Sequence, residues 1–229
     1  MDENRVFYDP EREAQRRAQQ EEEKKALCLS RALQLEKWMR LLFWLVIGAN
    51  IVGLFSSDTM AEIFPVFYWI ITVFSSLCGV LYALILWKMS KIENLYQSAA
   101  YCALAGTALA LVGAIISFGI LGKLLALLLS LPGVVFTLAG EYREYMAHAA
   151  VLEGIDPELP TKWRTLWKLY IGFLLAAFCA AFLVIFPLIG GLVLIGSIIG
   201  LLVVSIMKLV YLYRSAEALR IYPRTIKKP

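Results

Sequence analysis

The polar residues that interrupt the apolar runs of this 229-residue chain are the first candidates for chemistry. Asn50 is the strongest polar group deep inside such a run, and Ser75 and Ser76 lie at a comparable depth in the next run. Amides and hydroxyls in such positions form interhelical hydrogen bonds, each contributing about 0.6 kcal/mol on average, or they line a path for a polar solute. We favour the packing role and keep the solute path as the alternative.

A second polar group lies between two later apolar runs. It includes Glu144, His148 and Glu153, which could form a site at the cytoplasmic face of a membrane together with Glu141 and the tyrosines and the arginine beside them. Such a site would suit a lipid-modifying enzyme. The interpretation that we prefer is an ordinary helix end with arginine and tyrosine at the lipid headgroups.

Most motifs of catalysis and cofactor binding are missing from the sequence. His148 is the only histidine, which excludes metal sites built from several histidines, and the four cysteines are too dispersed for a CxxC pattern or a disulfide framework. The sequence contains no Walker A, dinucleotide-binding, HExxH or GxSxG motif. We therefore predict no catalytic residue, no cofactor and no metal ion, and we expect a protein that is not an enzyme.

Charged residues are scarce within the apolar runs. Lys208 and Lys123 are expected near the ends of helices, where a lysine side chain can reach the aqueous boundary. This scarcity weakens the hypotheses of proton-coupled transport and of intramembrane proteolysis, which need buried ionisable groups. It leaves a facilitator, a lipid-binding protein and an uncharged pore open.

These candidate residues must be positioned by helices in a lipid bilayer. Hydrophobic residues make up 60% of the chain, and its mean hydropathy is +0.71, whereas soluble proteins contain roughly 45–50% apolar residues. The charged residues are concentrated before residue 41 and in short clusters between the apolar runs. A soluble fold could not bury so much apolar surface, so the bilayer is the expected surrounding.

Six apolar segments are long enough to cross the bilayer as helices, which takes about 20 residues each. We predict an all-α polytopic integral membrane protein, a bundle of six transmembrane helices arranged as three helical hairpins, with an N-terminal cytoplasmic helix. Residues 1–37 form that charged and amphipathic helix, residues 38–212 the transmembrane domain, and residues 213–229 a basic cytoplasmic tail. The predicted spans are residues 38–57, 65–87, 99–118, 120–140, 166–186 and 188–211, and Pro132 leaves the continuity of the fourth span open.

Lysine and arginine residues determine the predicted orientation. They cluster on the side that holds the N-terminus, whereas the opposite side has only Lys123 and a loop made acidic by Asp58 and Glu62. Both termini should therefore be cytoplasmic, in a plasma (inner) membrane, and the basic face should attract anionic lipids. Because the basic residues follow this face and form no compact patch, we expect no nucleic-acid partner.

Two helical segments are expected outside the bilayer. The N-terminal helix should begin at Asp9-Pro10 and run toward the first span. Its residues 26–35 are amphipathic, which fits either a partner-binding helix or a helix lying on the bilayer surface, and we prefer the second. The segment after the fourth span should stay helical to about Leu152, stop at Gly154 and restart with Thr161 as N-cap.

The tripeptide Ile-Phe-Pro occurs twice, ending at Pro65 and at Pro187, with similar residues at similar spacing around each copy. The two copies would belong to two similar helical hairpins, related as a parallel repeat if the duplication is ancestral. Proline is also favoured at the first turn of any helix, which explains part of the pattern without a duplication.

Small residues at four-residue spacing provide faces for close helix contact. The candidates are Ala49 with Gly53 and Gly196 with Gly200. The contact could form within one chain, between the copies of a homo-oligomer or with another membrane protein. Our leading hypothesis is a non-enzymatic scaffold or accessory subunit. The alternative is a small-solute facilitator or channel, and the third hypothesis is a lipid-modifying enzyme at the membrane surface. A continuous polar cavity that reaches Asn50 would favour the facilitator, and a dry core with Asn50 bonded to a neighbouring helix would favour the scaffold.

Overall fold

The computed structural model describes residues 10–54, 64–117, 119–182 and 187–226, and these residues form helices joined by short connections. No strand occurs in these ranges. The predicted loop that contains Asp58 and Glu62 and the second Ile-Phe pair before Pro187 lie outside them. The helices are α1 (Pro10–Leu54), α3 (Pro65–Met89), α4 (Leu95–Ile116), α5 (Gly119–Leu152), α6 (Leu159–Phe182) and α7 (Pro187–Ile226).

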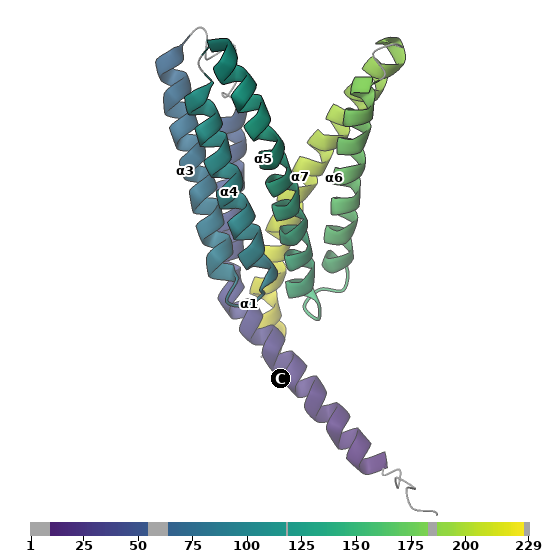
Figure 1. Ribbon diagram of the computed structural model, residues 1–229. Coiled ribbons are helices and arrows are strands. Elements are labelled where there is room, and N and C mark those ends of the chain that lie inside the picture. The colour runs from purple at the N-terminus through teal and green to yellow at the C-terminus, as the bar shows by residue number, and fades with distance from the viewer. Residues whose placement is uncertain (1–9, 55–63, 118, 183–186, 227–229) are drawn as a thin grey trace, which may run out of the picture.

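The helices run alternately up and down, and they form two arms that meet at one end (Figure 1). One arm contains α1, α3, α4 and α5. The other arm is the hairpin of α6 and α7, which diverges from the first toward the top of the view. The lower part of α7 packs against α1, and α6 packs against α5, so the two arms share one core at the lower end.

The lower and upper ends of the molecule differ in how far their side chains are buried. The largest fully buried side chains include Met39 of α1, Leu86 of α3, Tyr96 of α4, Trp163 of α6 and Leu212 of α7, and all of them belong to the core at the lower end. Toward the upper end, large apolar side chains are exposed on every helix of the bundle. Apolar surface of that extent needs a partner or a lipid surrounding.

Four helices in the described part of the chain are long and apolar enough to cross a membrane. They are Val66–Met89, Leu95–Ile116, Leu121–Leu152 and Leu188–Ile226. They coincide with the second, third, fourth and sixth predicted spans, and they support a helical membrane protein. The first and fifth predicted spans fall on α1 and α6, which are helical as expected but are not among these four.

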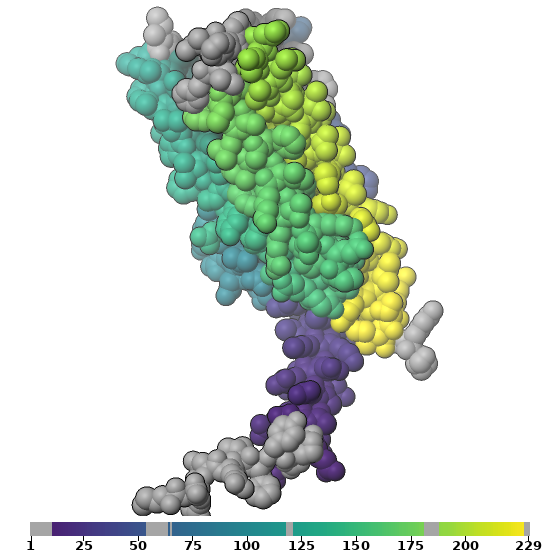
Figure 2. Space-filling view, turned by 90° about the vertical axis from the view of Figure 1, so that its right-hand side faces the viewer, coloured from purple at the N-terminus to yellow at the C-terminus, as the bar shows by residue number. Residues whose placement is uncertain are grey.

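The N-terminal helix begins at Pro10, as predicted, and continues without a break to Leu54. Its apolar stripe includes Cys28, which is buried, and Ala32, Leu35 and Met39, which belong to the shared core. The spacing of three and four residues puts this stripe on one face. That face packs on the chain itself, which differs from both expectations of a partner helix or a bilayer-surface helix. The turns before Cys28 are exposed and project beyond the rest of the molecule (Figure 2).

The connection from α5 to α6 forms a tight turn. α5 ends at Leu152, as predicted, and Gly154 adopts a φ of 83°, a backbone conformation that favours glycine. The predicted N-cap at Thr161 is wrong, because α6 already begins at Leu159 and the Asp156 carboxylate accepts hydrogen bonds from the N–H groups of Glu158 and Leu159. A hydrogen bond from Lys162 and its charge lower the pKa of the exposed Glu158 carboxyl.

Proline positions explain two helix starts and one tolerated interruption. Pro65 and Pro187 are the first residues of α3 and α7, where the missing N–H costs nothing. Pro132 lies inside α5, which remains one helix through it. The helix that carries Glu144 and His148 therefore extends unbroken from one end of the bundle to the other.

Candidate functional site: a charged cavity between five helices

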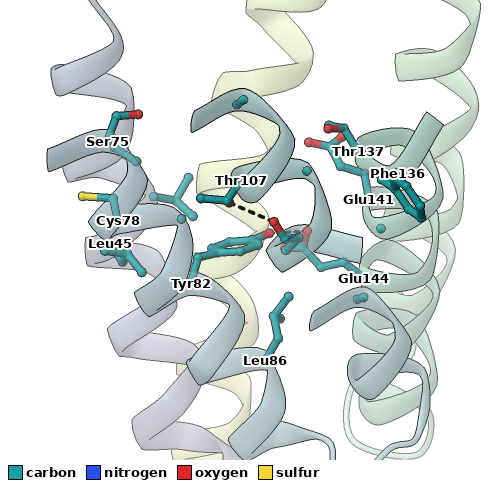
Figure 3. A pocket seen from close by; sticks show the side chains of 18 of the residues that line it. Leu45, Ser75, Cys78, Tyr82, Leu86, Thr107, Phe136, Thr137, Glu141 and Glu144 are labelled. Carbon is teal, nitrogen blue, oxygen red and sulfur yellow. Dashed lines mark hydrogen bonds between the residues drawn. The ribbon is translucent and has the colours of Figure 1, made fainter. Parts of the chain in front are cut away.

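A cavity of about 520 Å³ lies inside the first arm and reaches α7. Residues of α1, α3, α4, α5 and α7 line it, and Figure 3 shows side chains from several of these helices turned toward it. Along α3 its lining extends from Ser75 to Leu86, which corresponds to roughly 16 Å at 1.5 Å per residue. Its volume falls within the range of small-molecule sites.

Glu144 is the centre of the lower end of the cavity. Its side chain is only 1% exposed, and one carboxylate oxygen accepts hydrogen bonds from the Tyr82 hydroxyl and, at 3.1 Å, from the Lys208 ammonium. In Figure 3 the side chains of Tyr82 and Glu144 point toward one another. A buried carboxylate needs such partners to offset the loss of hydration. The contacts join α3, α5 and α7 at one point.

The other oxygen of Glu144 faces His148, one helical turn further along α5. His148 Nε2 lies 3.3 Å from this oxygen, and His148 Nδ1 lies 2.7 Å from the Tyr96 hydroxyl on α4. Because a carboxylate only accepts, Nε2 must carry the shared proton, which leaves Nδ1 to accept from Tyr96 when the ring is neutral. The result is a chain of hydrogen bonds from Tyr96 through His148 to Glu144.

Glu141 is held much more loosely than Glu144. Its nearest carboxylate oxygen is 3.8 Å from the Lys208 nitrogen, and its side chain is 27% exposed. Lys208 thus lies between two carboxylates, with the shorter contact to Glu144, and its nitrogen is also 5.1 Å from the centre of the Tyr145 ring. The cluster of Glu141, Glu144 and Lys208 contains all the charged side chains that line this cavity in the described structure.

Trp163 of α6 packs against the aromatic rings beside the charged cluster. The Trp163 ring centre is 4.5 Å from that of His148 and 5.4 Å from that of Tyr145, and the indole N–H donates to the Ser215 hydroxyl at 3.1 Å. Trp163, Tyr145 and His148 are all fully buried or nearly so. α6 contributes no lining residue, but its rings fix the orientation of the imidazole that bonds to Glu144.

The upper walls of the cavity carry uncharged polar groups. The structure brings Asn50, Ser75 and Ser76, which the sequence singled out, to the lining of this one cavity. Asn50 donates to the carbonyl of Val46 on its own helix at 2.9 Å, so its described hydrogen bond is not interhelical. Ser76 likewise donates to a carbonyl of its own helix, that of Thr72, at 2.9 Å.

The predicted cytoplasmic-face group separates in the structure. Glu144 and His148 are buried neighbours of the cavity, whereas Glu153 is exposed and forms an ion pair with Arg164 across the connection before α6. The i and i+4 spacing of Glu144 and His148 places both on one face of α5. Glu153 lies beyond the end of that helix, which is why it does not join them.

The predicted small-residue faces have different surroundings. Gly200 packs against the ring of Phe173 on α6, where an added Cβ would lie 2.3 Å from a ring carbon. Nothing lies within 4 Å of a Cβ added at Gly53 or Gly196, and Ala49 lines the cavity. Of the four residues, Gly200 is the one that the structure places in a tight helix contact.

Sequence reasoning grouped Glu141 with Glu144 and His148 but missed Tyr82, Tyr96 and Lys208 as members of this site. The expectation that Lys208 reaches the aqueous boundary is wrong, because its side chain is 13% exposed and bonds to Glu144. The signal for it was a lysine inside an apolar run together with glutamates at positions 141 and 144 on one helix face. Only the packing of α5 against α7 shows that these charges meet.

A second cavity, of about 510 Å³, lies between α4, α5 and α6. Its described lining is largely apolar and carries no charged side chain. The first cavity has the more distinctive chemistry, because charged groups, hydrogen-bonding groups and aromatic rings all line it.

The polar atoms of the charged cluster are largely engaged with one another. Among the described residues, no group of three His, Cys, Asp or Glu side chains could hold a metal ion. Glu144 and His148 have their polar atoms engaged with each other and with Tyr82, Lys208 and Tyr96. Comparison with protein-family models, with curated proteins and with solved structures gave no match to this chain.

Proposed function

We propose that the protein is a membrane facilitator for a small polar solute, and that the cavity is its binding site. The observation that carries this proposal is the continuity of the lining from the Glu144 cluster to Asn50. A charged and hydroxyl-lined space inside helices that can cross a membrane costs stability, and intramembrane polar groups commonly mark a solute pathway.

The hydrogen bond of Asn50 supports the facilitator over the scaffold. A packing role for this amide would use a bond to a neighbouring helix, which stabilises a bundle directly. Its described bond goes instead to Val46 of the same helix, and the side chain lines the cavity. The lipid-modifying enzyme receives less support, because Glu153 is remote from Glu144 and His148.

The membrane arrangement completes the proposal. We propose six crossings in the plasma membrane, with both ends of the chain in the cytoplasm, where the basic residues would contact anionic lipids. The alternating directions of the six helices and the position of the C-terminal end near α1 are consistent with an even number of crossings (Figure 1). The core at the lower end would then lie on the cytoplasmic side.

Swelling of proteoliposomes tests this proposal. Purified full-length protein is reconstituted and exposed to inward gradients of glycerol, urea, ethanolamine hydrochloride and sodium acetate. We expect protein-containing vesicles to swell faster than empty ones for at least one of these solutes. Ser76→Phe should remove that difference, because Ser76 lines the cavity and a phenyl ring would fill part of it.

Val73→Phe is the matched control for this test. Val73 lies about one turn away on α3, is 60% exposed and is not part of the described cavity lining. Equal swelling by vesicles with the wild-type protein, with Ser76→Phe and with no protein would refute a solute pathway through this cavity.

A further inference from the structure

The charge balance of the cavity favours a cationic solute. Its charged lining consists of the carboxylates of Glu141 and Glu144 and the ammonium of Lys208. When all three are ionised, the two negative charges exceed the single positive charge. A partly enclosed site with unbalanced negative charge attracts cations and disfavours anions, since charges interact more strongly where water is scarce.

The unbalanced charge is located on Glu141. Glu144 already receives hydrogen bonds from Tyr82, Lys208 and His148. Glu141 faces the same lysine at 3.8 Å, which is beyond ordinary hydrogen-bond length, and its side chain remains 27% exposed. The Tyr170 hydroxyl also forms a hydrogen bond to Glu141, but a carboxylate has about four lone-pair sites, so Glu141 retains acceptor capacity that a solute can use.

Several hydrogen-bond donors of the cavity walls are engaged within their own helices. Thr107 donates to the carbonyl of Ala103 at 2.8 Å, and Thr137 donates to the carbonyl of Gly133 at 2.9 Å. Ser76 and Asn50 donate in the same way to their own helices. These groups still offer acceptors, namely the lone pairs of the three hydroxyls and the amide oxygen of Asn50, and Asn50 also keeps one amide N–H.

A solute that uses these acceptors and the Glu141 carboxylate must donate hydrogen bonds. Lys208 offers little to an anion, since its ammonium faces both glutamates. The rings of Tyr82 and Phe136 also line the cavity, and aromatic faces attract cations. Positive charge, N–H donors and a modest apolar body are thus the properties that match the site.

We propose that the solute is a small organic cation bearing N–H donors, of the primary ammonium or guanidinium class, and that Glu141 is its counter-ion. This inference rests on the proposed solute pathway and specifies its chemistry. The cationic group lies beside Glu141, and the rest of the molecule extends toward the acceptors of Thr107, Thr137 and Asn50.

Calorimetric titration with matched probes tests the solute class. The purified full-length protein in mild detergent is titrated with benzylammonium, benzyltrimethylammonium, benzyl alcohol and benzoate, which share one ring and differ in charge and N–H donors. We expect benzylammonium to bind most tightly, benzyltrimethylammonium more weakly because it lacks N–H groups, and benzoate not at all.

Substitutions of Glu141 test the counter-ion. Glu141→Gln should weaken benzylammonium binding at least about tenfold, since removal of one partner from an enclosed charge pair is costly. Glu141→Asp keeps the charge and should retain most of the affinity, which separates loss of charge from loss of folding. Glu153→Gln is the control, because Glu153 lies outside the described cavity lining and pairs with Arg164.

The outcomes distinguish this inference from the proposed function. Binding of benzyl alcohol or benzoate as tight as that of benzylammonium overturns the cationic class while leaving a solute site in place. Unchanged benzylammonium binding by Glu141→Gln overturns the role of Glu141. Absence of binding by every probe also overturns the inference, and the swelling assay with glycerol and urea then decides separately whether a pathway exists.

Discussion

Glu144 illustrates how a single buried side chain determines the character of the site. Its carboxylate contacts Tyr82 of α3, His148 of α5 and Lys208 of α7, with the side chain almost fully shielded from solvent. A buried ion pair of this kind contributes little net stability compared with apolar residues, but removal of one member leaves the other charge without compensation. The cluster should therefore be sensitive to single substitutions and more tolerant of paired ones.

Glu144→Gln should lower the stability of the protein by about 3–5 kcal/mol, because Lys208 would keep only the distant contact to Glu141. Thermal unfolding of the purified chain in detergent measures the change. The double variant Glu144→Gln, Lys208→Met should be more stable than the Glu144→Gln variant, since it removes the unpaired ammonium as well. A double variant less stable than both single variants would contradict this account of the pair.

The exposed ion pair of Glu153 and Arg164 provides the comparison. Their side chains are 56% and 50% exposed, and exposed pairs contribute roughly 0–1 kcal/mol. The unfolding temperature of the Glu153→Gln variant should therefore lie within a few degrees of that of the wild type. If Glu153→Gln lowered the stability as much as Glu144→Gln does, burial would not explain a difference between the contributions of the two glutamates.

At the scale of the helices, much of the fold could be predicted from the sequence. The start at Pro10, the end at Leu152 and the helix starts at Pro65 and Pro187 follow from local signals such as capping and proline geometry. The cap by Asp156 was missed because Thr161 is also a residue type that caps helices, and only the hydrogen bonds to the Asp156 carboxylate show that α6 is capped earlier.

The candidate site was predictable only in part, for a physical reason. Asn50, Ser75 and Ser76 stand out as polar residues in apolar runs, and their depth alone identified them. Lys208 could reach either the aqueous boundary or an acidic partner, and the choice depends on how α7 crosses α5. Long-range packing of that kind leaves no local pattern in one sequence, so the charged half of the site required the structure.

Gly200 and Gly196 form a matched pair for testing the contact between α6 and α7. An alanine Cβ at Gly200 would lie 2.3 Å from the Phe173 ring, whereas nothing lies within 4 Å of one at Gly196. Gly200→Ala should lower the free energy of unfolding by about 1–3 kcal/mol, because the added methyl group overpacks the contact. Gly196→Ala should stabilise by up to about 1 kcal/mol through its better helix propensity. Equal unfolding temperatures for both variants in detergent would argue against this helix contact.

At the scale of the whole molecule, the cavity depends on both arms. Its walls come mainly from α1, α3, α4 and α5, but Ser205 and Lys208 come from α7, which is paired with α6 in the other arm. The arms share a packed core at the lower end and diverge at the upper end (Figure 1). The contact of Lys208 with Glu144 thus joins the arms at the boundary between the packed core and the cavity.

The sidedness of the connections follows from the alternating helices and can be measured directly. Lys91, Ser117 and Glu153 lie in the connections after α3, α4 and α5. In a chain without its native cysteines, Lys91→Cys and Glu153→Cys should react with a membrane-impermeant thiol reagent from the same side, and Ser117→Cys from the other. The reason is that α4 and α5 are each long enough to cross about 30 Å of hydrocarbon, α5 even with Pro132 inside it. Labelling of Ser117→Cys and Glu153→Cys from one side would show that α5 does not cross, and the cavity would then open to water along that helix instead of lying within the membrane.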